Sequence, residues 1–208
     1  PQNLTPDTIS ILDIDEVAYR EDKMQSKLYG YLKVPKAQNL IQAGKKSSRT
    51  EKSINKIKNE IAHYIIDNII EDCLYFLGPG TTVKNILKKL NLSYILLGID
   101  AICNKELVAK DVNEKRILEL LSEFKTAKII VSPIGGQGFI FGRGSKQFTP
   151  EVLRKIGKEN IMIISTEDKL KDLDCLRVDT GDKDVDKNLQ GFIKVIIGYN
   201  IRELIEIK

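Results

Sequence analysis

Glycines and side-chain donors gather in one stretch of the chain, residues 128–151, which reads KIIVSPIGGQGFIFGRGSKQFTPE. Within ten residues it holds the glycines Gly135, Gly136, Gly138, Gly142 and Gly144. So many glycines cost backbone entropy and are justified where the chain needs positive φ or the close approach of another group. Amide and cationic donors lie among them, namely Gln137, Arg143 and Lys146. We predict a ligand-binding loop beside a sheet edge, with a tight crossover between strands as the alternative.

A second candidate is the turn Gly78-Pro79-Gly80-Thr81-Thr82, which follows an apolar run and precedes a helical pattern. Gly78 and Gly80 allow close approach of the backbone to a ligand, and the free N–H groups of a helix start favour an anion. Thr81 and Thr82 add hydroxyl donors. The turn is not a P-loop, because no lysine directly follows the glycines. A phosphate or carboxylate site is one interpretation, and a simple capped turn is the other.

Asp100 closes the segment LLGID, where a carboxylate can accept a hydrogen bond from a ribose hydroxyl or act as a base. It can equally cap the following turn, which is the commoner use of aspartate. Further residues suited either to a site or to a turn are Asp111, Asn113, Asp179 and Asp182. The single histidine, His63, lies in a helical pattern without a partner motif, so nucleophilic hydrolysis is disfavoured. One histidine and scattered cysteines do not make a metal-ligand set of usual spacing.

The composition is that of a soluble globular protein, with 42% hydrophobic and 30% charged residues among 208. A net charge of +4 is too slight to indicate nucleic acid as the partner. No apolar run approaches the ~20 residues that cross a bilayer, and the amino terminus lacks the regions of a signal peptide. The cysteines Cys73, Cys103 and Cys175 each adjoin an apolar run, which indicates buried thiols in a reducing compartment. We expect a cytoplasmic protein and, since the sequence begins without Met, a processed chain or an excised fragment.

The first part of the chain predicts an antiparallel pair of strands over residues 8–14 and 27–34. We assign residues 1–43 to this β segment, linking to a domain upstream. A basic flexible loop is expected over 44–52, whose lysines and arginine could meet an anionic ligand but are more typical of a solvated loop. Residues 53–208 are expected to form an α/β domain.

After Ser53 the chain alternates strand with helix. Apolar residues at helical spacing predict helices over 53–70, 81–90 and 114–124, another after Thr149 as N-cap, and a short one over 167–173. Strands are predicted over 73–77, 94–99, 129–131, 161–165 and 176–178, with a closing hairpin over 192–197 and 204–207. This pattern indicates a mostly parallel sheet with helices on both faces. In such sheets ligands bind outside the carboxyl ends of the strands, where the three candidate segments fall.

The segments LGPGTTVKNI, LLGIDAI, ELVAKDVNE, VSPIGGQGFIFGRGSKQFTPEVLRKIG and LRVDTGD together resemble the ATP-NAD kinase-like family. The branch that includes the acetoin-catabolism protein X is the most similar, and LDIDEVAYREDKMQSKLYGYLKVP also resembles it. The resemblance implies phosphorylation of NAD, or a related substrate, by ATP or polyphosphate with Mg. The family's GGDGT loop, which carries the catalytic aspartate, is absent here. The chain therefore resembles a carboxyl-terminal, substrate-side portion, and no residue inherits that catalytic role.

Two conflicts stay open at this point. Classical NAD kinases pair their nucleotide domain with a carboxyl-terminal β-sandwich, whereas the periodicity of this chain favours strand–helix alternation. The GPGTT turn also resembles, weakly, folds of phosphosugar isomerases and deaminases, so a binding or isomerase-type domain for a phosphorylated small molecule is the alternative. A second alternative is a structural domain for homo-oligomer assembly, in which the glycines only shape a crossover.

Overall fold

The computed structural model describes residues 6–14, 26–35 and 51–208 of the chain. The chain divides into two compact units, Pro1–Ser48 and Arg49–Lys208. A two-stranded sheet belongs to the first unit, and a seven-stranded sheet belongs to the second.

In the first unit, β1 (Pro6–Ile14) and β2 (Ser26–Pro35) pair antiparallel, as their alternating pattern predicted. Large apolar side chains on this ribbon are exposed, including Tyr29 and Tyr31. Residues 15–25, and the predicted basic loop up to residue 50, lie outside the described residues.

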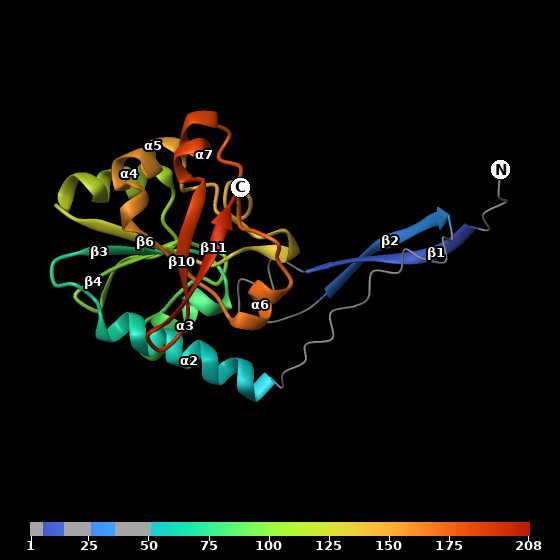
Figure 1. Ribbon diagram of the computed structural model, residues 1–208, viewed down its shortest axis with the longest axis horizontal. Coiled ribbons are helices and arrows are strands. Elements are labelled where there is room, and N and C mark those ends of the chain that lie inside the picture. Colours follow the sequence, from blue (N-terminus) through green and yellow to red (C-terminus); the bar gives the residue numbers. More distant parts are fainter. Residues whose placement is uncertain (1–5, 15–25, 36–50) are drawn as a thin grey trace. The chain divides into compact units, whose positions relative to one another are not determined.

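The second unit is built on its seven-stranded sheet (Figure 1). In their order across the sheet, the strands are β11 (Ile201–Ile207), β10 (Gly191–Gly198), β8 (Ile161–Ile164), β6 (Ala127–Val131), β3 (Leu74–Leu77), β4 (Asp100–Cys103) and β5 (Glu106–Ala109). The four strands β10, β8, β6 and β3 are mutually parallel, and antiparallel pairs extend the sheet on both sides. The predicted mostly parallel sheet and the closing hairpin β10–β11 are thus confirmed.

Helices cover both faces of the sheet (Figure 1). One face packs against α2 (Glu51–Asp67) and α3 (Thr81–Lys89), and the other packs against α4 (Glu114–Glu123), α5 (Pro150–Ile156) and α7 (Lys183–Leu189). A hydrophobic core lies on each face of the sheet, and alternate residues of β3 contribute to each. Tyr75 and Leu77 belong to the core on the α2–α3 side, and Leu74 and Phe76 belong to the other. Buried strands of this kind are apolar throughout, which explains the continuous apolar runs of the sequence.

The strand predicted over residues 94–99 is wrong. These residues form turns and irregular backbone, and the strand begins at Asp100. Its contacts are with turns and not with a neighbouring strand. A Cβ on Gly98 would overlap Asp111 Oδ1, and Leu96 O accepts a hydrogen bond from Gly80 N. Asp100 therefore opens a strand that pairs antiparallel with β3, opposite Leu77.

The hydrophobic pattern of the sequence did not predict some of the short elements. Strand β5 returns from β4 through Asn104 and Lys105, which have φ of 51° and 67° and so make a two-residue hairpin turn. The pattern also missed α7, whose N-cap Asp182 stood in a segment interpreted as the end of a strand. The remaining elements are α6 (Glu167–Lys171), the 3₁₀ turns η1 (Gly135–Gln137) and η2 (Lys158–Asn160), and the small parallel pair β7 (Phe139–Phe141) and β9 (Arg177–Val178).

Candidate functional site

Two of the predicted segments follow neighbouring parallel strands at the carboxyl edge of the sheet. The turn Gly78–Thr82 follows β3, and the glycine-rich stretch begins after β6. Strands β3 and β6 pair in parallel with Leu77 opposite Ile130, and Gly78 N donates to Ile130 O at 2.9 Å. A Cβ on Gly78 would lie 3.0 Å from Val131 Cγ1, so a side chain would crowd the neighbouring strand.

The turn after β3 leads into α3, whose first turn has no side-chain cap. Gly80 is the N-cap with φ of 103°, and no side chain caps the helix there. Thr81 is exposed and Thr82 is buried. Lys58 Nζ of α2 donates to Thr81 Oγ1 at 2.9 Å. Burial lowers the pKa of Lys58 from the ordinary lysine value, an effect that Glu51 partly opposes.

Ser132 is a polar residue of this edge that sequence reasoning missed. It follows β6 directly, it is 4% exposed, and its hydroxyl has no hydrogen-bond partner among the described residues. Ile130 belongs to the α2–α3 core, and strand alternation places Ser132 on the same face. Ser132 directly follows β6, and the turn Gly78–Thr82 directly follows its parallel neighbour β3. A single serine after an apolar run gives no signal in the sequence.

Asp100 is fully buried and both of its carboxylate oxygens are engaged. Oδ2 lies 2.7 Å from Lys84 Nζ, and Oδ1 accepts from Asp111 N at 3.0 Å. Lys84 is 1% exposed, and its ammonium also donates to Leu77 O at 3.0 Å. Burial lowers the pKa of Lys84, while the neighbouring Asp100 favours its charged form. This geometry favours a structural role for Asp100 over contact with a ligand.

The glycines of the second segment divide into two kinds. Gly138 and Gly142 have φ of 77° and 89°, and a Cβ on them would lie 2.7 Å from Cys175 O and overlap Asp179 O, respectively. They therefore let β7 and β9 approach each other. Gly135 and Gly136 form an exposed 3₁₀ turn with Gln137, and a Cβ on either would meet no atom within 4 Å. The packed glycines Gly138 and Gly142 fit the tight crossover, and the open glycines Gly135 and Gly136 leave room for a ligand-binding loop.

Arginines gather around Gln137 on this loop. Arg143 donates to Gln137 Oε1 at 3.2 Å, and its guanidinium lies 4.6 Å from the centre of the Phe139 ring, within cation–π range. Asp179 faces Arg143 at 3.6 Å, a largely exposed pair that contributes little. Arg177, which the sequence did not single out, donates to Gln137 O at 2.8 Å. Two guanidinium groups, Arg143 from this stretch and Arg177 from β9, thus lie beside the exposed Gln137.

Several of the other polar candidates serve as helix caps. Asn113 accepts from Arg116 N at the start of α4, and Asp182 accepts from Asp184 N and Val185 N at the start of α7. The predicted cap Thr149 accepts from Val152 N. His63 is exposed on α2. The cysteines are free thiols, two buried and Cys103 half-buried.

The part of the chain that the structure describes contains scattered His, Cys, Asp and Glu side chains. In it, no group of three or more His, Cys, Asp or Glu side chains could hold a metal ion. The described residues thus form no cluster of this kind for Mg. None of the described helices combines the length and apolar character that a membrane crossing requires.

Comparison with known proteins identifies the family. Residues 70–207 match the family described as ATP-NAD kinase C-terminal domain. Neither the curated proteins nor the solved structures contain a match. The match covers every strand of the seven-stranded sheet and the carboxyl edge with its two loops. This chain therefore belongs to the ATP-NAD kinase C-terminal domain family.

Proposed function

We propose that this domain binds the phosphate group of an NAD-like substrate at the turn Gly78–Thr82. The observation that carries the proposal is the open start of α3, where no side chain caps the helix and Lys58 reaches the first turn. The first-turn N–H groups of a helix point outward and carry part of the helix dipole, which favours an anion. The ammonium of Lys58 adds a full positive charge.

Ser132 adds a second, independent reason. A buried hydroxyl without a partner costs about 1–3 kcal/mol, so a serine is expensive at this position unless it acquires a partner. Ser132 follows β6 at the same edge of the sheet at which the turn follows β3. A bound oxyanion would accept from this hydroxyl as well as from the helix start.

Membership of the family suggests the substrate class. In the longer protein that the resemblance implies, an upstream GGDGT domain would supply the phosphoryl donor, ATP or polyphosphate, and the catalytic aspartate. The present domain would hold the substrate, with the Gln137 loop and its arginines facing the ligand or the upstream domain. Phosphoryl transfer itself is assigned to that longer protein.

Thermal unfolding with NAD, NADP or glucose 6-phosphate tests the proposal. At a hundredfold excess over Kd, a ligand that binds only the folded state adds about 2.7 kcal/mol to the free energy of unfolding. Stabilisation by NAD or NADP supports the dinucleotide, and stabilisation by the sugar phosphate alone supports the isomerase-type alternative. If no anion stabilises the protein, the site does not exist and the assembly role is favoured.

Two substitutions locate the binding. Lys58→Gln removes a charge-assisted contact worth about 1.5–3 kcal/mol, so the affinity should fall about tenfold or more. Lys56→Gln is the matched control on the same helix, because Lys56 is 80% exposed and pairs only loosely with Glu60 at 4.0 Å. Ser132→Ala should weaken the ligand while leaving the free protein equally stable or more stable. Unchanged affinity in both site variants would contradict the location.

The pH dependence has a defined sign. Burial lowers the pKa of Lys58 in the free protein, and a bound anion raises it again by favouring the ammonium. The affinity should therefore be greatest below the free-state pKa and fall as the pH rises through it. Lys58→Gln should remove this alkaline fall, and Lys56→Gln should retain it.

A further inference from the structure

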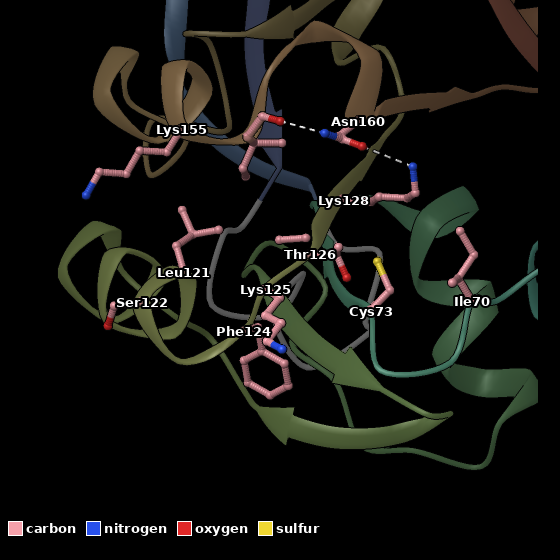
Figure 2. A pocket seen from close by; sticks show the side chains of 12 residues that line it. Ile70, Cys73, Leu121, Ser122, Phe124, Lys125, Thr126, Lys128, Lys155 and Asn160 are labelled. Atoms are coloured by element: carbon pink, nitrogen blue, oxygen red, sulfur yellow. Dashed lines mark hydrogen bonds between the residues drawn. The ribbon is translucent and has the colours of Figure 1, made fainter.

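A pocket lies at the opposite, amino-terminal edge of the sheet (Figure 2). It has a volume of about 590 Å³, within the range of small-molecule sites. Its wall includes Ala127 and Lys128 at the start of β6 and Cys73 just before β3. The carboxyl-edge site lies beyond the other ends of these two strands. The pocket is therefore separate from the site proposed above.

Three lysines give the wall of this pocket a positive charge. Lys125, Lys128 and Lys155 line it, and among the described residues of its wall none is acidic. Lys128 Nζ donates to Asn160 Oδ1 at 3.1 Å, and Asn160 Nδ2 donates to Ile156 O at 2.8 Å, as the dashed lines in Figure 2 show. Lys155 also pairs with Glu151 at 3.4 Å, an exposed i,i+4 contact that a ligand could displace at small cost.

The rest of the wall can hold the body of a molecule. Leu121 and Phe124 come from the end of α4 and its C-cap, and the buried Ile156 comes from α5. The hydroxyl residues Ser122 and Thr126 also line the pocket, and Thr126 lies between Leu121 and Lys128 in Figure 2. Charges of one sign around a concave, partly apolar wall focus their field on it. On an ordinary solvated surface, by contrast, lysines lie on convex regions and alternate with carboxylates.

We propose that this pocket is a second ligand site, which takes a small organic polyanion bearing phosphate or carboxylate groups and a flat apolar part. The lysines would contact the anionic groups, and Leu121, Phe124 and Ile156 would contact the apolar part. The site needs no metal and no residue of the carboxyl edge.

Methyl NMR of the full chain tests the site with pyrophosphate, citrate and ADP as probes. The methyls of Leu121 and Ile156 report on the pocket, and the methyls of Val83 report on α3. The titrations are repeated in the Lys58→Gln background, so that the carboxyl edge does not contribute. We expect saturable shifts of the pocket methyls with at least one probe, and tighter binding of ADP than of pyrophosphate. Saturable shifts with pyrophosphate or citrate but not with ADP would contradict the apolar part of the proposed ligand.

Neutralising the pocket lysines tests whether they hold the ligand, and neutralising three exposed lysines elsewhere is the control. Lys125→Gln, Lys128→Gln and Lys155→Gln together should weaken binding at least tenfold, whereas the same three-charge loss at the exposed residues Lys52, Lys88 and Lys89 should change it less than twofold. The double variant Lys125→Gln, Lys155→Gln leaves the Lys128–Asn160 bond intact and serves if the triple variant unfolds. Equal loss in the pocket and control variants, or no saturable shift with any probe, would overturn the proposal.

Discussion

At the scale of single residues, the buried pair of Lys84 and Asp100 shows how a polar group can be essential without touching a ligand. Lys84 lies on α3, and its ammonium joins the end of β3 to the start of β4 through Leu77 O and Asp100. Such pairs contribute little net stability compared with apolar packing, but either partner left alone is costly. Asp100 therefore fixes the base of the turn on which the anion site stands.

We predict that Lys84→Met lowers the free energy of unfolding by about 3–5 kcal/mol, because it leaves a buried carboxylate without a counter-charge. The double variant Lys84→Met, Asp100→Asn should recover most of this loss, since asparagine retains an acceptor for Asp111 N. Urea unfolding of the wild type, both single variants and the double variant measures the coupling. Additive losses would show that the two charges do not depend on each other.

At the scale of elements, the glycine-rich stretch combines a packed crossover with an open turn. Gly142 lies against Asp179 O where β7 and β9 pass, whereas Gly136 faces open space. Local sequence rules can count these glycines but cannot tell which of them meet another segment, because the contacts come from residues about 40 positions away.

Gly142→Ala should therefore destabilise the protein by more than about 2 kcal/mol, because it adds a clash to the cost of a left-handed backbone in an L-residue. Gly136→Ala should stay within about 0.5 kcal/mol, as surface changes usually do. Thermal melts of the two variants make the comparison. Equal effects would mean that the open turn is packed in solution.

Helices α3, α4 and α5 and the long strands could be predicted from the sequence, since these helices have apolar stripes and two of them have side-chain caps. Helix α7 could not. The antiparallel strands β4 and β5 were harder to predict. Residues 94–99 are as apolar as a strand but pack against the turn instead, and β5 has only four residues. Ser132 and the basic pocket became visible only in three dimensions, because each depends on neighbours from other elements.

At the scale of the molecule, both hydrophobic cores belong to the second unit. As far as the chain is described, their members all come from residues 57–207. The anion site and the basic pocket likewise use residues of Arg49–Lys208 alone. A unit with its own core can fold by itself. This suggests that the second unit is an autonomous domain with both of its sites.

We predict that a chain of residues 49–208 folds cooperatively, with a Tm within a few degrees of that of the 208-residue chain. It should also retain the affinity for NAD or NADP and for the pocket probes, because no residue of either site is removed. Circular dichroism melts and the same methyl titrations compare the two chains, with Lys58→Gln in both as the control for the carboxyl edge. Loss of the cooperative transition would show that the first 48 residues complete the core, and loss of ligand binding in a folded domain would show that they complete a site.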